Sequence, residues 1–212
     1  IWFESVAALC DEMGIPWIAP SDPAAPALHA QVAAAQPDFI FSFYYRHMLP
    51  TALLALAPRG AYNLHGSLLP KYRGAAPMQR ALMDGCLETG VCVQKMVKQL
   101  DAGDVIAEKR IPVPREMTYG ELQGELCELS KPLLLSVIRL FEREIPPATS
   151  QDPSQVTFAA KIETEECQID WRQTAEVVHN KVRALSPRPG AWCWIQIDGQ
   201  MKRLKILRTK IL

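Results

Sequence analysis

The sequence predicts an α/β fold in which helices cover both faces of a mostly parallel sheet. Short apolar runs alternate with helical patterns along the first half of the 212-residue chain, an order that is typical of such sheets. Apolar residues make up 49% of the chain, an ordinary value for a globular protein with a sizeable core. In sheets of this kind, ligands bind beyond the carboxyl ends of the strands.

The individual elements follow from hydrophobic periodicity and from the residues that bound each run. Apolar residues at helical spacing predict helices over residues 3–13, 26–35, 51–57, 76–83, 122–140 and 177–185. Apolar or aromatic runs predict strands over residues 15–18, 39–44, 60–64 and 91–96, and a tight loop is expected at 99–104. Thr118 and Glu121 form a capping-box pattern at the start of the longest helix.

The pattern changes beyond the longest helix. Three prolines in residues 145–153 indicate a linker, and the composition shifts again near Pro187. Residues 192–197 and 204–207 predict a β-hairpin that turns at Asp198-Gly199. Because two strands are too few for an independently stable β domain, we expect the second domain to be cut short.

The formal net charge is zero, but the charge is unevenly distributed. Residues 181–212 contain eight basic residues and one acid, a net charge of +7, which leaves −7 on residues 1–180. A basic C-terminal part is typical of a surface that binds a polyanion. The same charge is also compatible with an ordinary solvated face of a small β domain.

Several classes of protein do not fit this composition. The chain has no run of eighteen apolar residues and no charged-then-apolar leader before Ile1, so we expect no membrane span and a cytoplasmic location. None of the six cysteines forms a Cys-x-x-Cys pair. We therefore expect free thiols rather than disulfides or a metal site.

The candidate chemistry lies where two predicted strands end. Asn63 and His65 are two residues apart, so their side chains project to the same side of an extended segment, and Asp101 lies on a later tight loop. Such a set suits acyl transfer to an amine, with Asn63 and protonated His65 donating to the developing oxyanion while Asp101 orients the imidazole and assists proton transfer. Taken singly, each residue type is more often a turn, cap or core residue.

The residues around this site also form a recognisable pattern. Asn63-Leu-His-Gly-Ser-Leu-Leu-Pro70 is followed by Gly74-Ala-Ala-Pro77 and then by Asp101-Ala-Gly103. In order and spacing these segments resemble the motifs of the folate-dependent formyltransferases, and the similarity extends along essentially the whole chain. The resemblance implies a Rossmann-like sheet whose first strand is absent here, followed by the start of a small OB-like barrel. The implied domains are a formyltransferase catalytic domain at 1–150, a linker and connecting helix at 151–186, and the start of the OB-like domain at 187–212.

The same resemblance implies the substrates and their contacts. The donor would be 10-formyltetrahydrofolate. Its formyl group would be transferred through a tetrahedral intermediate with the help of Asn63, His65 and Asp101, and no metal would take part. The folate contacts that it implies are His47, Met48, Leu49, Ser67, Leu68, Leu69, Pro70, Val97 and Leu100.

The resemblance leaves the acceptor between two amines. From Gly74 onward the chain is similar to the members that act on methionyl-tRNA, and the basic C-terminal part supports a tRNA. Residues 41–47 and 63–67 are similar instead to the member that acts on UDP-4-amino-4-deoxy-L-arabinose, although Ala75 stands where that member has Arg. We expect methionyl-tRNA, with an amino-sugar nucleotide as the alternative. A non-catalytic RNA-binding fragment is the alternative of another class.

Overall fold

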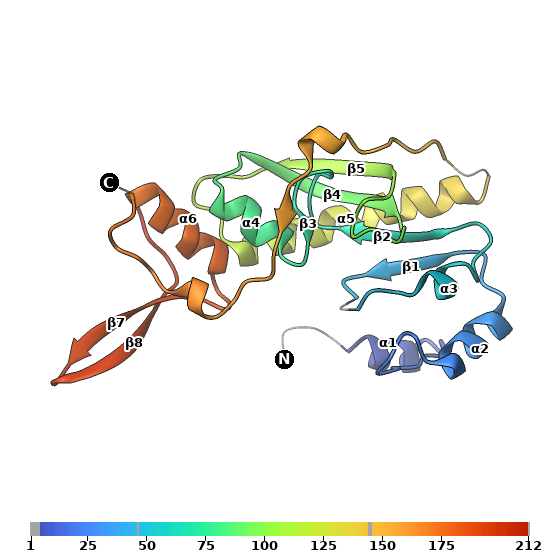
Figure 1. Ribbon diagram of the computed structural model, residues 1–212, viewed down its shortest axis with the longest axis horizontal. Coiled ribbons are helices and arrows are strands. Elements are labelled where there is room, and N and C mark those ends of the chain that lie inside the picture. The colour runs from blue at the N-terminus through green and yellow to red at the C-terminus, as the bar shows by residue number, and fades with distance from the viewer. Residues whose placement is uncertain (1–4, 46, 144–145, 212) are drawn as a thin grey trace.

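A computed structural model of the chain describes residues 5–45, 47–143 and 146–211. Its main sheet has the strand order β1-β2-β4-β5 (Figure 1). The strands are β1 (Ile40–Phe43), β2 (Ala61–His65), β4 (Glu88–Lys95) and β5 (Val105–Pro112). Strand β1 runs parallel to β2, whereas β4 is antiparallel to both β2 and β5. The α/β prediction is confirmed, but among the described strands the sheet is mixed, and its parallel part is smaller than expected.

The longest helix packs against this sheet and forms the main core with it. Helix α5 (Tyr119–Phe141) begins at the predicted capping box, in which Thr118 and Glu121 bond each other's backbone. Its buried stripe consists of Leu122, Leu126, Leu133, Val137 and Phe141. These side chains meet Tyr62, Leu64, Val91 and Val93 of the sheet. The core therefore lies directly behind the strand that carries Asn63 and His65.

The remaining helices and short strands surround this unit. They are α1 (Val6–Glu12), α2 (Pro26–Ala35), α3 (Thr51–Leu54), α4 (Pro77–Met83), α6 (Ala175–Leu185), the 3-10 turns η1 (Pro153–Gln155) and η2 (Glu165–Cys167), and the parallel pair β3 (Arg73–Gly74) and β6 (Phe158–Ala159). Helices α4 and α6 pack against each other. Phe3 and Ile145, the first residues of an expected helix and of the expected linker, lie outside the described residues.

One expected strand is absent, and one strand of the sheet was not expected. Residues 15–18 form no strand, and Ile15, Trp17 and Ile18 are each about half exposed. Pro16 has no N–H to donate, and an apolar run without a neighbouring strand has no ladder to join. Strand β5 was not expected, because its sequence Val-Ile-Ala-Glu-Lys-Arg-Ile-Pro is polar in the middle. It lies at the edge of the sheet, where those charged residues are exposed.

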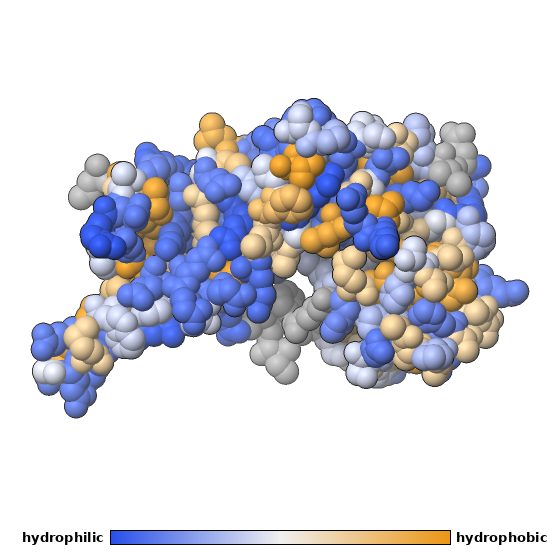
Figure 2. Space-filling view, in the orientation of Figure 1, coloured by the Kyte–Doolittle hydropathy of each residue, from blue (hydrophilic) through white to orange (hydrophobic). Residues whose placement is uncertain are grey.

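The C-terminal hairpin is confirmed. Strands β7 (Ala191–Ile197) and β8 (Gln200–Ile206) pair in antiparallel register, and Asp198 and Gly199 both adopt positive φ, 52° and 75°, as a tight two-residue turn requires. The hairpin projects away from the sheet (Figure 1), and hydrophilic residues predominate over this end of the molecule (Figure 2). The base of β7 joins a second, smaller core with Val182 and Leu185 of α6.

Candidate functional site

A cleft of about 730 Å³ opens at the end of β2. Its walls come from the segment between β1 and α3, the start of α4, the loop between β4 and β5, and the first turn of α5. Of the residues predicted for the site, those that line the cleft are Asn63, His65, Asp101, His47, Met48, Leu49, Val97 and Leu100. Residues from three segments that are distant in the sequence thus meet around one cavity.

Strand β2 sets the positions of Asn63 and His65. They are two residues apart on one strand, and they stand opposite Gln94 and Cys92 of β4. His65 is 5% exposed. Its Nε2 lies 2.9 Å from the carbonyl oxygen of Tyr72, and because a carbonyl can only accept, Nε2 carries a proton. The other ring nitrogen, Nδ1, is left to face the cleft.

Asp101 lies beside that second nitrogen. The distance from His65 Nδ1 to Asp101 Oδ2 is 3.6 Å, so the two form an ion pair when the imidazole is doubly protonated. Both carboxylate oxygens also accept hydrogen bonds: Oδ2 from the backbone N–H of Gly74 at 2.9 Å, and Oδ1 from the side-chain amide of Gln94 at 2.8 Å. Asp101 itself adopts a left-handed backbone conformation with φ 48°, which Asp tolerates better than most residues.

The glycine that follows two residues later explains the Asp-x-Gly spacing. A Cβ added to Gly103 would lie 1.7 Å from the carbonyl oxygen of Lys95, a distance that no side chain could occupy. The loop is therefore pressed directly against the end of β4. This close approach brings Asp101 back over the strand toward His65.

The set combines two kinds of groups. Asn63 provides amide donors, and His65 provides an N–H when it is protonated, both at one end of the cleft. Asp101 provides a fixed negative charge within reach of the imidazole. Such an arrangement can stabilise negative charge on an oxygen in the cleft and can hold or move a proton.

The cysteine paired with His65 across the sheet does not provide a nucleophile at neutral pH. Cys92 is fully buried beside His65 in the strand register, and burial raises the pKa of its thiol to about 12. The thiolate form that would act as a nucleophile is therefore not populated.

Four of the predicted folate contacts do not line the cleft: Ser67, Leu68, Leu69 and Pro70. Ser67 is fully buried, and its hydroxyl donates to the carbonyl oxygen of Lys71 at 2.7 Å. Leu69 is also buried. Leu68 and Pro70 are half-buried, and the folate contacts that the resemblance implies for these four residues stay a prediction.

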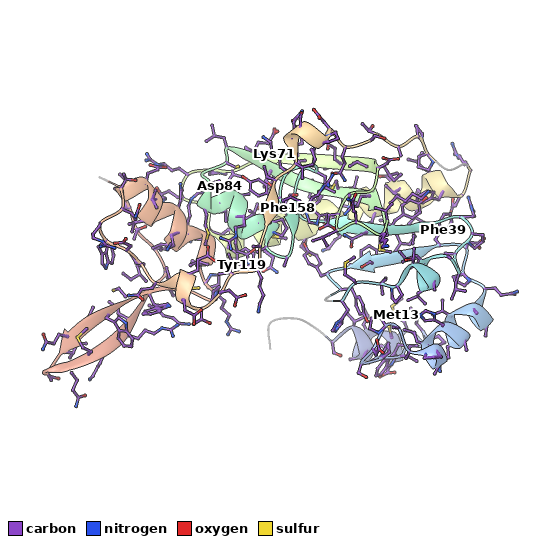
Figure 3. The ribbon with its side chains drawn as sticks, in the orientation of Figure 1. Met13, Phe39, Lys71, Asp84, Tyr119 and Phe158 are labelled. Carbon is purple, nitrogen blue, oxygen red and sulfur yellow. The ribbon has the colours of Figure 1, made fainter. Side chains whose placement is uncertain are left out.

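Two residues at the site were missed by the sequence analysis. Gln94 interrupts the apolar run of β4, and this buried polar side chain could have been recognised as a sign of the site. Tyr119 lines the cleft from the first turn of α5 and is marked in Figure 3. Burial raises the pKa of the Tyr119 phenol, so it faces the cleft as a neutral hydroxyl.

Neither a metal site nor a membrane-spanning helix is found within residues 5–45, 47–143 and 146–211. No group of three or more His, Cys, Asp or Glu side chains in these ranges is arranged to hold a metal ion. None of the helices in the same ranges combines the length and the apolar character that crossing a membrane requires.

Comparison with solved structures places the fold among known formyltransferases. The N-formyltransferase from Helicobacter canadensis, solved with folinic acid and dTDP-3-aminofucose, superposes with a TM-score of 0.76 at 18% identity, covering 98% of this chain and 71% of that one. At this identity the likeness shows the fold alone.

Sequence comparison is more specific. The methionyl-tRNA formyltransferase of Protochlamydia amoebophila is 47% identical over 175 residues, which is 82% of this chain and 55% of that protein. The methionyl-tRNA formyltransferase of Bartonella tribocorum is 38% identical over 201 residues, which is 95% of this chain and 65% of that protein. The chain thus spans a little over half to about two thirds of the length of these relatives.

Matches to protein families agree with these relatives. Residues 3–138 match the formyl transferase family, and residues 161–212 match the formyl transferase C-terminal domain. The first match alone covers more than half of the chain and includes Asn63, His65 and Asp101. The chain therefore belongs to the formyl transferase family.

Proposed function

We propose that this chain transfers a formyl group from 10-formyltetrahydrofolate to the amino group of initiator methionyl-tRNA. The observation that carries the proposal is the convergence of Asn63, His65 and Asp101 at one end of a single cleft. Relatives named methionyl-tRNA formyltransferase support the reaction and the acceptor. The chain covers 55% and 65% of the length of these two relatives, so we propose for it an activity that their names assign to longer proteins.

The residues present fit a folate donor. A cleft of about 730 Å³ lies within the range of small-molecule sites. The side chains of Met48, Leu49, Val97 and Leu100 give one part of its wall an apolar surface suited to a pterin ring. The donor supplies the formyl group, and the protein supplies orientation and charge stabilisation.

In the proposed mechanism, His65 and Asn63 stabilise the oxygen of the formyl group. A neutral amine attacks the formyl carbon, a C–N bond forms, and negative charge develops on that oxygen. His65 Nε2–H is already committed to Tyr72, so the proton on Nδ1 is the one available to the oxygen. The distance of 3.6 Å from Nδ1 to Asp101 Oδ2 is longer than a hydrogen bond, so Nδ1–H is not committed to the carboxylate and can donate to the substrate.

Asp101 would manage the charge and the proton. Its carboxylate stabilises the imidazolium, and it can receive the proton that the amine loses, directly or through water. The bond from the formyl carbon to the folate nitrogen then breaks, and that nitrogen takes the proton. The products are the formylated amine and tetrahydrofolate, with atoms and charge balanced.

The basic C-terminal part supports tRNA as the acceptor. Lys202, Arg203 and Lys205 are exposed along β8, on a hairpin that projects from the body (Figure 1). Cationic surface supplies much of the affinity of proteins for nucleic acids. An acceptor of this kind also implies a location in the cytoplasm, where aminoacyl-tRNA is used.

One experiment separates the candidate functions. The protein is incubated with labelled 10-formyltetrahydrofolate and either methionyl-tRNA or UDP-4-amino-4-deoxy-L-arabinose, and the labelled product is measured. We expect label on methionyl-tRNA, whereas label only on the sugar nucleotide would reject the proposed acceptor. Calorimetric titration with a stable folate analogue tests the donor separately, because a non-catalytic RNA-binding protein would bind tRNA without binding folate.

A further inference from the structure

Residues 149–159, here called the strap, connect the two loops that form the site. At one end, Thr149 exchanges two backbone hydrogen bonds with Val105, at 2.9 and 2.8 Å. At the other end, β6 pairs with β3 in parallel register, and Thr157 accepts a backbone bond from Arg73. The proline-rich sequence predicted a linker over part of this segment, but the strap is fixed to the body at both ends.

Gln151 is the point at which the strap reaches the Asp101 loop. Its amide nitrogen donates to the carbonyl oxygens of Asp101 at 2.9 Å and Gly103 at 2.7 Å, which uses both of its protons. Its oxygen accepts two hydrogen bonds from the guanidinium of Arg73, at 3.0 and 2.7 Å. One half-buried side chain therefore ties the strap, the Arg73–Gly74 strand and the Asp101 loop together.

The Asp101 loop needs this support. Asp101 is held at a positive φ, and such a conformation persists when surrounding contacts determine it. The carboxylate is fixed from the front by Gly74 and Gln94, while the backbone behind it is fixed by Gln151. Without Gln151, the two loop carbonyls would have to find other donors, and the loop would be free to rotate the carboxylate away from His65.

We propose that Gln151 is a positioning residue for the transfer reaction: it holds the Asp101 loop against Arg73–Gly74 so that the carboxylate faces His65. This inference rests on the proposed function for its kinetic consequences, but the loop contacts can be tested without activity. Gln151 does not line the cleft, so its effect would pass through Asp101 rather than through the substrates.

The kinetic test compares Gln151→Glu, Gln151→Ala and a control, Gln155→Ala, in the purified protein. Glu keeps an acceptor for Arg73 but replaces the donor to the loop carbonyls with a negatively charged oxygen that repels them, whereas Ala removes the contacts with both. Gln155 lies on the same strap, is exposed, and bonds Asp152 instead of the catalytic loops. We expect both Gln151 variants to lose about 10- to 100-fold in kcat and to change the pH dependence of kcat, with KM for the folate donor nearly unchanged.

A second measurement makes the outcome independent of activity. Amide hydrogen exchange should become about tenfold faster in residues 99–104 of Gln151→Ala, with the helical core unchanged, and should stay at the wild-type rate in Gln155→Ala. Unchanged exchange in the loop would overturn the inference. The inference would also be overturned if kcat fell only in proportion to the fraction of folded protein and its pH dependence did not change. Failure of the wild-type protein to transfer formyl groups would reject the proposed function, while the exchange comparison would still decide the role of Gln151.

Discussion

The strand that carries the site and the hairpin at the C-terminus are built in opposite ways. Strand β2 is covered on both sides of the sheet, and four of its five residues are buried. Strand β8 has six exposed residues out of seven, and it pairs with β7 while Ile206 at its end packs against the second core. Both are short strands in antiparallel contact with a neighbour, so the difference lies in what surrounds them.

This difference separates two tasks. A donor to an oxyanion must be held in place before the reaction, which burial and hydrogen bonds achieve for His65. A surface that attracts a polyanion needs exposed positive charge rather than exact placement. On the proposed function, changes in the buried region should alter kcat, and changes in the hairpin should alter the apparent affinity for tRNA.

The largest effect is expected for His65→Ala. The substitution removes an oxyanion donor and the positive charge that Asp101 faces, so kcat should fall by about 1000-fold or more while the protein stays folded. Steady-state formylation of methionyl-tRNA and circular dichroism give the two measurements. His29→Ala on α2 is the control, since His29 bonds the carbonyl oxygen of Pro23 and lies outside the cleft walls. Wild-type turnover in His65→Ala would show that His65 on β2 has no role in the reaction.

The next effect is expected for Asp101→Asn. The amide keeps the size of the carboxylate but loses its charge and its capacity to take a proton, so kcat should fall by about 100- to 1000-fold. Its hydrogen bond from Gly74 can be retained. Asp152→Asn, an exposed position on the strap, serves as the control and should keep kcat within about twofold. A rise in KM for the folate with kcat unchanged would show that Asp101 binds substrate without assisting the reaction.

The features that could be predicted from the sequence are those that neighbouring residues determine. The two site residues on β2 follow from strand spacing alone, and Asp101 follows from the motif, whose glycine the structure explains by its contact with Lys95. The capping box and the Asp198-Gly199 turn are also local, because each depends on residues within three positions of one another. Short segments of sequence are sufficient to determine features of this kind.

Features that depend on distant partners were missed or misassigned. Ile15 to Ile18 has the composition of a strand but no neighbouring strand to pair with, while β5 has a polar composition and gains its place from β4. Gln151 looked like part of a linker because nothing near it in the sequence indicates that it meets Asp101. Composition alone does not encode these long-range contacts.

A smaller effect is expected from the hairpin. Replacing Lys202 of β8 and Lys210, which follows the hairpin, together by Ala removes two exposed charges from the basic part and should raise KM for methionyl-tRNA by about tenfold at low salt, with kcat little changed. The salt dependence of binding should become less steep by about two in the logarithmic slope. Lys131→Ala, on the exposed face of α5, is the matched control and should leave both values unchanged. Equal effects from Lys131 and the hairpin would mean that overall charge, not the hairpin, attracts the tRNA.

The smallest effect concerns the ion pair that connects the C-terminal end of the chain, just beyond the hairpin, with helix α5. Arg208, just beyond β8, donates to Glu121 in the first turn of α5. Hydrogen bonds from Thr118, and secondarily Arg208, lower the pKa of Glu121 from its ordinary value of 4.5. A carboxyl whose pKa is lower in the folded state stabilises the fold above its unfolded pKa, and this contribution disappears as the pH falls through the folded value.

Glu121→Gln should therefore destabilise the protein at pH 7, and the loss should be smaller at pH 3, below the ordinary pKa of 4.5. Because the Glu121 side chain is 47% exposed, solvent screening limits the loss at pH 7 to below about 1 kcal/mol. Urea unfolding at both pH values measures it, with Glu125→Gln as the control, since Glu125 is exposed on the same helix. A loss of the same size at both pH values would assign the effect to the helix cap rather than to charge. The contact with the hairpin end would then add nothing to the stability of the body, and the two regions would be independent in stability as well as in task.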